Sequence, residues 1–159
     1  MKQDLCAKFD NGVLNIRAGA IILKDGKLLM VGNDRIDYLY SVGGRIKFGE
    51  SAEEAVVREV YEETGVKMEI DRLGFIHENF FISPDPGSEG KTVHEITFYF
   101  YMKTPAGFEP KSESFTEYKG REHLTWVSPE DDGRMYPEFF KTELDRSAET
   151  VKHIVTDNR

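Results

Sequence analysis

The chain has 159 residues and a mass of 18.2 kDa, a length that suits one domain with its own hydrophobic core. Hydrophobic residues make up 39% of it and charged residues 31%, which excludes collagen-like, low-complexity and largely disordered proteins. Asp and Glu outnumber Lys and Arg by 29 to 21, a net charge of -8, so the overall field disfavours a nucleic-acid polymer as partner. Any phosphate must therefore be bound locally, by a few arginines or by metal ions that carboxylates hold.

The sequence shows neither a membrane span nor a secretory signal. The sequence has no apolar stretch of about 18 residues, as a membrane span needs, and its first residues, MKQDLCAKFDNG, lack the apolar core of a secretory signal. We therefore expect a cytoplasmic location and no membrane association. Cys6 is the single cysteine, which excludes an intramolecular disulfide framework and a Cys-rich zinc site.

Apolar and β-branched runs predict the first strands, at Asn15–Leu23 and Lys27–Val31. Asp25 and Gly26 lie between them, and both residue types tolerate the positive φ angles of a tight hairpin turn. A short strand is expected at Leu39–Val42, directly before two glycines.

The clearest helix is expected at Ala52–Thr64. Ser51 can cap its first turn while Glu54 reaches back to Ser51, the reciprocal arrangement of a capping box. Gly65 readily adopts the left-handed conformation in which helices end. The sequence therefore indicates both ends of this helix.

The rest of the chain alternates strands with polar loops and ends in a helix. The expected elements are strands at Val66–Ile70, Leu73–Phe81, Thr92–Thr104 and Leu124–Val127, and a final helix at Pro137–Leu144. Strands on both sides of a central helix, with another helix at the end, predict an α/β fold in which a mixed sheet lies between helices. We expect this to be one domain over residues 1–159.

Three glutamates of the central helix share one of its faces. Glu59, Glu62 and Glu63 are spaced i, i+3, i+4. Clustered carboxylates repel one another unless they are compensated. Hard divalent cations prefer carboxylate oxygens, and Mg²⁺ takes phosphate oxygens as further ligands. A solvated acidic helix face has the same local pattern, so the wider spacing has to decide between the two interpretations.

The wider spacing fits Gly-x5-Glu-x7-Arg-Glu-U-x-Glu-Glu-x-Gly-U, in which U is aliphatic, over Gly44–Val66. The matching residues are Gly44, Glu50, Arg58, Glu59, Val60, Glu62, Glu63, Gly65 and Val66. This segment resembles the Nudix box, with every defined position present.

The resemblance implies a Nudix-type α/β/α sandwich that hydrolyses a nucleoside diphosphate linked to another group X. The box would hold Mg²⁺ or Mn²⁺ against the pyrophosphate, and water would attack phosphorus. By position, Glu59, Glu62 and Glu63 would be metal ligands, and the backbone carbonyl of Gly43 could add another. The partner would be a small nucleotide, and a homodimer is an open alternative to a monomer.

The resemblance also implies which residues of this chain are catalytic: Glu59, Arg58 and Glu62. Glu59 is the first candidate for the base that takes the proton of the attacking water. Glu117 and Glu122, which follow the central strands, stay open as alternatives.

Arg58 is expected to bond Glu50 and so to fix the box loop onto the helix. An ordinary surface contact with Glu54 or Glu62 is the alternative. The motif demands an arginine at this place, which favours the contact with Glu50.

Positive charge near the box would help to bind the substrate phosphates, and a solvated arginine is the alternative at each of two positions. Arg17 and Arg35 flank the box in sequence, and a guanidinium can bond phosphate bidentately. Gly44, in a tight turn, completes the expected substrate-binding set.

A non-catalytic nucleotide-binding or sensing module of the same fold is the competing interpretation. Such modules commonly lose acids of the box, whereas this chain keeps them all, which favours an enzyme. An isomerase of prenyl diphosphates would need a cysteine near the site, and Cys6 fits that poorly. The sequence does not indicate which nucleoside diphosphate derivative is the substrate.

Overall fold

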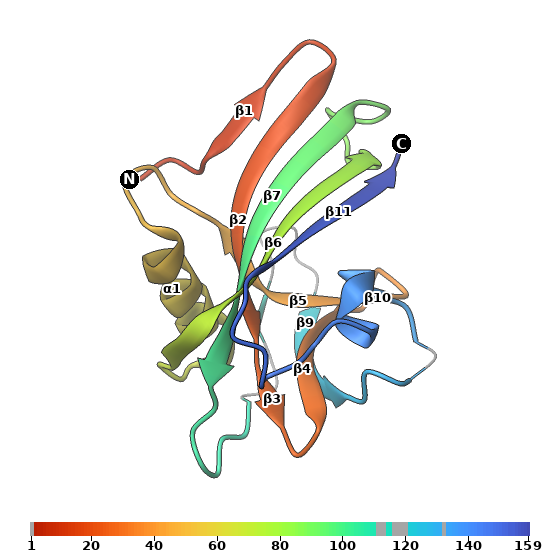
Figure 1. Ribbon diagram of the computed structural model, residues 1–159. Helices are drawn as coiled ribbons and strands as arrows, with labels where there is room; N and C mark the ends of the chain where they lie inside the picture. The colour runs from red at the N-terminus through yellow and green to blue at the C-terminus, as the bar shows by residue number, and fades with distance from the viewer. Residues whose placement is uncertain (1, 111–113, 116–120, 132) are drawn as a thin grey trace.

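One mixed β-sheet organises the chain in the structure, a computed structural model that describes residues 2–110, 114–115, 121–131 and 133–159. Its strands are β1 (Cys6–Lys8), β2 (Gly12–Ile21), β3 (Leu23–Lys24), β4 (Lys27–Asn33), β5 (Leu39–Arg45), β6 (Glu69–Ile82), β7 (Thr92–Lys103), β8 (Ser114–Phe115), β9 (Arg121–Val127), β10 (Met135–Tyr136) and β11 (Lys152–Asn158). The helices of the described part are α1 (Ala52–Thr64) and a short 3₁₀ helix, η1 (Glu138–Lys141). Figure 1 shows α1 against one side of the strands.

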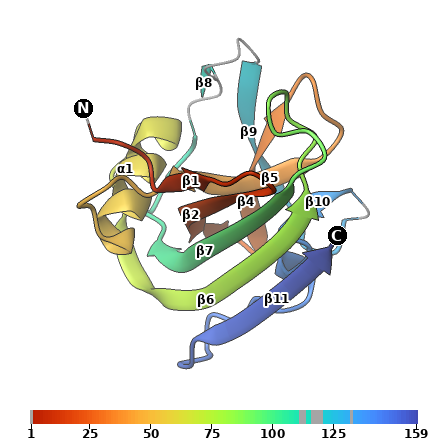
Figure 2. The same ribbon diagram turned by 90° about the horizontal axis from the view of Figure 1, so that it is seen from above.

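Strand β2 lies at the centre of the sheet. The strand order is β11-β6-β7-β2-β5-β4-β9-β8, and β1, β10 and β3 add to β2, β5 and β4. β2 runs parallel to β7, with Gly12 opposite Thr92, and antiparallel to β5, with Arg17 opposite Arg45. Figure 2 shows β2, β7, β6 and β11 following one another in a curved layer. Strand β5, which leads into the box, thus shares the neighbour β2 with the long strand β7.

Local signals account for the helix and the first hairpin. The Ser51 hydroxyl accepts a hydrogen bond from the backbone N–H of Glu54 at 3.1 Å, and the Glu54 carboxylate accepts one from the N–H of Ser51 at 2.9 Å. Gly65 ends the helix with φ of 73°. Asp25 and Gly26, with φ of 50° and 74°, form the turn between β3 and β4. The predicted capping box, helix end and hairpin turn are confirmed.

The two faces of the sheet bury different clusters, because side chains alternate along a strand. Ala18 and Ala20 of β2 face helix α1, where Val60 is fully buried in the same cluster. Ile21 belongs to the cluster of the other face, together with Phe140 of η1. A helix on one face and a short helix on the other confirm the expected α/β fold.

The prediction of a helix over Pro137–Leu144 is wrong, because only the four residues of η1 are helical in this segment. Directly after η1, Glu143 still donates from its N–H to the carbonyl of Phe139 at 2.8 Å, but Asp145 bonds to side chains of the sheet. The N–H of Asp145 donates to the Tyr101 hydroxyl at 2.9 Å, and Arg72 donates to the carbonyl of Asp145 at 2.8 Å. These contacts end the helical turn early and lead the chain into β11.

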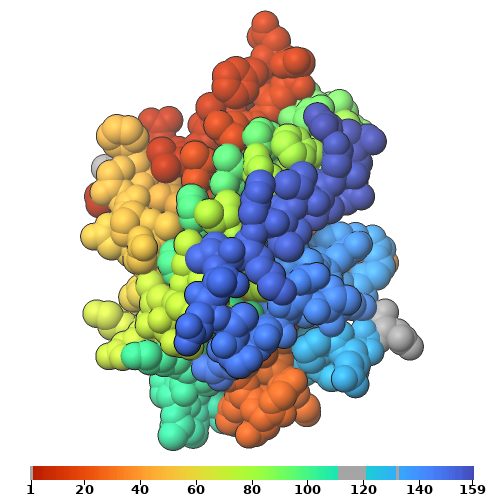
Figure 3. Space-filling model, in the orientation of Figure 1, coloured from red at the N-terminus to blue at the C-terminus, as the bar shows by residue number. Residues whose placement is uncertain are grey.

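Two other expectations about strands are corrected. The strands expected at Val66–Ile70 and Leu73–Phe81 form one strand, β6, whose register against β7 shifts twice near Arg72. Strand β11 was not expected, and it extends the sheet beside β6. Figure 3 shows the C-terminal segment, in blue, running over the face turned to the viewer. Among the described residues, no helix is long and apolar enough to cross a membrane.

Candidate active site

Two glycines at the end of β5 allow close approaches that a side chain would prevent. Gly43 has φ of 146°, and a side chain there would collide with the carbonyl oxygen of Ala18. A side chain at Gly44 would collide with the carboxylate of Glu59. Gly43 therefore allows β2 to approach closely, and Gly44 allows the Glu59 carboxylate to lie directly against the backbone of the strand.

The guanidinium of Arg58 ties the box together. Its Nε and Nη2 donate to the two carboxylate oxygens of Glu50 at 2.7 and 2.9 Å, a bidentate pair. Nη1 donates to Glu59 at 2.6 Å and to Glu62 at 3.3 Å, and Nη2 also donates to the carbonyl of Arg45 at 3.1 Å. The hydrogen bonds between them lower the pKa of Glu50 and raise the pKa of Arg58. The expected contact between Arg58 and Glu50 is present, and it fixes the loop onto the helix.

The three glutamates of the helix have different surroundings. The Glu62 side chain is 52% exposed, whereas the Glu59 side chain is 14% exposed. Burial raises the pKa of Glu59 against the opposing effect of Arg58. Burial, and then the charges of Glu59 and Glu122, raise the pKa of Glu63 well above its usual range. Two enclosed neighbouring carboxylates cost free energy unless a cation joins them.

One carboxylate oxygen in this cluster has no partner. Glu63 Oε2 is buried without a hydrogen bond to the described residues, although the nearby backbone N–H of Gly43 partly opposes the rise in the pKa of this carboxylate. Among the described residues, no three His, Cys, Asp or Glu side chains are arranged to hold a metal ion. The donor chemistry nevertheless fits a hard divalent cation, because such ions prefer oxygen ligands and Glu63 offers an unpaired one beside Glu59.

A polar cavity of about 410 Å³ lies next to these acids. Its lining comes from the N-terminal segment, β2, the box loop and α1: Asp4, Arg17, Arg45, Lys47, Arg58, Glu59 and Glu62. Basic and acidic side chains that meet in one cavity suit an anionic ligand that carries a cation with it. Asp4 reaches the cavity because the first residues pair with the box loop, where Phe48 donates from its N–H to the carbonyl of Gln3 at 2.7 Å.

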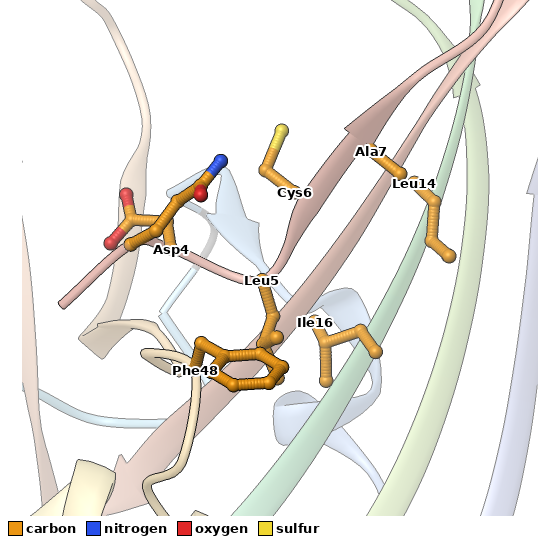
Figure 4. Close-up of a pocket in the computed structure, with 8 residues that line it drawn as sticks. Asp4, Leu5, Cys6, Ala7, Leu14, Ile16 and Phe48 are labelled. Carbon is orange, nitrogen blue, oxygen red and sulfur yellow. The ribbon is translucent and has the colours of Figure 1, made fainter.

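A second cavity, of about 310 Å³, shares Asp4 with the polar one. Its lining is mostly apolar and includes Leu5, Ile16 and Phe48. Figure 4 shows the Phe48 ring beside Leu5 and close to Ile16. Because the Phe48 residue is 73% exposed, the box loop presents an aromatic ring to solvent close to the polar cavity.

Arg17 is one of the predicted residues that the structure brings to the polar cavity. Its Nε lies 3.9 Å from the carboxylate of Glu95. Burial alone would lower the pKa of Arg17, but the charges of Glu95, Tyr99, Glu59 and Glu63 outweigh it and raise the pKa. Arg17 is therefore a cation placed between the box acids and strand β7.

The remaining predicted residues are placed differently. Arg35 lies in an exposed turn after β4 and is not among the described residues that line the two cavities. Glu117 lies outside the described residues. Glu122, on β9, accepts a hydrogen bond from the Tyr40 hydroxyl at 2.7 Å, and its charge raises the pKa of Glu63. Of the two loop candidates for the base, Glu122 therefore lies near the box acids.

Three cavity residues were missed by sequence reasoning. Arg45 and Lys47 alternate with Ile46 directly after the glycines, and alternate residues of an extended segment point to the same side. That pattern could have found both of them. Asp4 carries no such signal, because its position depends on pairing between the N-terminal segment and the box loop.

Comparison with known proteins agrees with this geometry. A family model described as NUDIX domain matches residues 13–143. A MutT-like protein of Streptomyces ambofaciens is 26% identical over 127 residues, which cover 80% of this chain and 71% of the relative. An ADP-ribose pyrophosphatase of Methanocaldococcus jannaschii is 33% identical over 95 residues, 58% of this chain, and the match spans about half of the relative, 52% of its length.

Solved structures share the fold. A mutator MutT protein from Bacillus halodurans has a TM-score of 0.64 at 21% identity, covering 91% of this chain and 90% of that one. A MutT NUDIX hydrolase from Burkholderia pseudomallei has a TM-score of 0.59 at 21% identity, covering 83% and 98%. Since the family model spans most of its length and Gly44–Val66 fills the box, the chain belongs to the Nudix hydrolase family, whose enzymes act on phosphoanhydrides.

Proposed function

We propose that this chain is a metal-dependent pyrophosphohydrolase that cleaves the diphosphate of a nucleoside diphosphate linked to another group X. One observation carries the proposal: Glu63 Oε2 is buried without a hydrogen-bond partner among the described residues. Its neighbour Glu59 lines a cavity that is rich in basic side chains. The acids need a cation and the basic side chains need an anion. A diphosphate with its metal ion supplies both.

The box acids are the proposed ligands of the metal. Glu59, Glu62 and Glu63, with the backbone carbonyl of Gly43, would hold Mg²⁺ or Mn²⁺. When bound, such an ion neutralises the diphosphate and lowers the pKa of a coordinated water. Arg58 acts through its partners, because it holds the Glu59 carboxylate in place.

The basic side chains of the cavity would position the substrate. Arg17, Arg45 and Lys47 can donate to phosphate oxygens and so hold the reacting phosphorus in line with the attacking water. Glu59 is the preferred base for the proton of that water. Glu122 is the second candidate because it lies near Glu63, and Glu117 is the third.

The proposed substrates are small nucleotide derivatives of the cytoplasm. One relative carries the name ADP-ribose pyrophosphatase, so ADP-ribose heads the panel to be tested. Nucleotide sugars, dinucleotide polyphosphates and nucleoside triphosphates follow it, because each contains a phosphoanhydride next to a nucleoside.

The test is hydrolysis of this panel by the purified protein with Mg²⁺ or Mn²⁺, read as phosphate released with and without added phosphatase. We expect turnover of at least one substrate and its loss in excess EDTA. Full turnover in EDTA would overturn the metal dependence. Millimolar Mg²⁺ or Mn²⁺ should also raise the melting temperature, because an ion that binds only the native state stabilises it.

A nucleotide-sensing module of the same fold is the competing function. Such a protein would bind a nucleotide of the panel, measured by calorimetry, and release no product from it. The complete set of box acids favours the enzyme, because a protein that only binds has no need to retain all of them.

A further inference from the structure

Three polar side chains beside the proposed diphosphate site make no hydrogen bonds to other described residues. Asn15 and Arg17 lie on the same face of β2, and Asn15 pairs in register with Glu95 of β7. Asn15 is 7% exposed, and its Oδ1 is buried without a partner. Within the described part of the chain, Arg17 and Glu95 are joined by an ion pair at 3.9 Å and make no hydrogen bond.

Two other buried polar side chains of the described residues are paired. The Thr64 hydroxyl donates to the carbonyl of Val60 at 2.6 Å, and the ring of His77 meets the Thr156 hydroxyl at 2.9 Å. In the described residues, the two buried side-chain atoms without a partner are Asn15 Oδ1 and Glu63 Oε2. An unpaired buried polar group destabilises the folded state, and at Glu63 a bound metal accounts for it. Asn15 needs a different explanation.

The three residues adjoin the polar cavity through Arg17, which lines it together with Glu59. A diphosphate bound at Arg17 would extend its next chemical group along β2 toward Asn15 and Glu95. An ionised carboxylate only accepts hydrogen bonds, whereas an amide both donates and accepts. The group at this place must therefore offer hydrogen-bond donors, which excludes a further phosphate.

Resting on the proposed function, we propose that Asn15 and Glu95 form the subsite for hydrogen-bond donors of the nucleoside, with Arg17 at the adjoining phosphate. Glu95 accepts from a hydroxyl or amino group of the nucleoside, and Asn15 bonds the neighbouring polar atom. The donors can come from the ribose hydroxyls or from the amino group of the base. Either source would donate a hydrogen bond to the Glu95 carboxylate, and nucleotide analogues that lack one donor distinguish the two.

The test measures binding of ADP, 2′-deoxy-ADP, 3′-deoxy-ADP and IDP by calorimetry with Mg²⁺. The wild type should bind ADP about 10- to 100-fold more tightly than the analogue that lacks the recognised donor, the range of a hydrogen bond to a charged group. Glu95→Ala should bind ADP and that analogue equally. The analogue that loses affinity identifies the source of the donor.

Asn15→Leu separates recognition from support of the fold. Removing a buried amide that has no partner should maintain or raise the melting temperature, while ADP binding weakens about 10-fold. Asn15→Ala replaces it if leucine does not fit. Glu69→Ala is the matched control for Glu95, because this carboxylate at the other end of the long strands is 84% exposed and pairs with Lys103. The control should keep wild-type affinities.

Several results would overturn the inference. These are equal binding of all four nucleotides by the wild type, no detectable binding of ADP, or a Glu95→Ala variant that keeps the wild-type preference. If Asn15→Leu lowers the melting temperature and leaves the affinities unchanged, Asn15 only supports the fold. Failure of the proposed hydrolysis has a separate sign, the absence of turnover across the substrate panel.

Discussion

Helix α1 and strand β2 each bring an arginine to the polar cavity, and the two guanidinium groups are held in opposite ways. Arg58 bonds Glu50 bidentately and also bonds Glu59, whereas Arg17 has one ion pair, at 3.9 Å to Glu95. A guanidinium whose donors are used holds the structure together. One whose donors are unused can bind a ligand. The same residue type thus supports the fold in one region and faces the ligand in the other.

The acids between the two arginines should give the largest effect. Glu59→Gln and Glu63→Gln keep the size of the side chain and remove its charge, so turnover should fall by about 10³-fold or more, about 4 kcal/mol in the barrier. The melting temperature should stay the same or rise slightly, because repulsion between carboxylates is relieved. Steady-state rates and thermal melts on the same preparations check both statements. Near wild-type rates for both variants would show that the acids are only a solvated face.

Arg58→Ala tests the supporting arginine. It removes the guanidinium that pairs with the Glu50 carboxylate, whose side chain is 8% exposed, and leaves only the backbone N–H of Lys47 as a described donor to it, so we expect a loss of stability of about 3 kcal/mol. For a chain of this length that corresponds to a melting temperature lower by about 6–12 °C. Arg58→Lys keeps the charge without the bidentate geometry, and its melting temperature should lie between those of the wild type and Arg58→Ala. A wild-type melting temperature for Arg58→Ala would remove the contrast between the arginines.

A buried histidine, unlike the two arginines, should make the stability of the fold depend on pH. His77 is 4% exposed, and its ring packs edge-on against Phe139. Burial lowers its pKa to about 4 from 6.5, so the unfolded chain takes up the proton first as pH falls. The stability linked to this group is therefore complete above about pH 6.5 and is lost toward pH 4, by up to about 3 kcal/mol. His77→Phe should flatten the acid side of the stability profile, and an unchanged slope would contradict this assignment.

Arg17→Gln should have the smallest effect on the fold. A loose ion pair contributes little stability, so the melting temperature should change by no more than about 2 °C. KM should rise about 10-fold with little change in kcat, because a contact to the bound phosphate is lost. Arg17→Lys should restore part of the affinity. A drop in melting temperature as large as that of Arg58→Ala would show that both arginines support the fold.

The box region could be predicted because its signals are local. Ser51, Gly65 and the spacing of the acids lie close together in sequence, and the helix at Ala52–Thr64 is confirmed with both its ends. The subsite across the sheet could not be predicted. Asn15 meets Glu95 only because two strands far apart in the chain pair in one register, and no local pattern encodes that register.

The expected final helix and the expected role of Arg35 have different outcomes. The segment after Pro137 has residues that favour a helix, but contacts of Arg72 and Tyr101 with the backbone at Asp145 end it after one turn. Arg35 was expected near the substrate because it lies close to the box in sequence. The structure places it in an exposed turn after β4, outside the described lining of the polar cavity, and its contact with the substrate stays a prediction.

The parallel pairing of β2 with β7 imposes a delay on folding during synthesis. Thr92, the partner of Gly12, comes 80 residues later in the chain. Helix α1 and the β3–β4 hairpin need only nearby residues, whereas contacts of high sequence separation form slowly. At about 5–20 residues per second, a ribosome needs roughly 4–16 s to deliver β7 after β2. For that interval the backbone N–H and C=O groups along this edge of β2 have no partner strand, and the edge can pair with another chain or bind a chaperone.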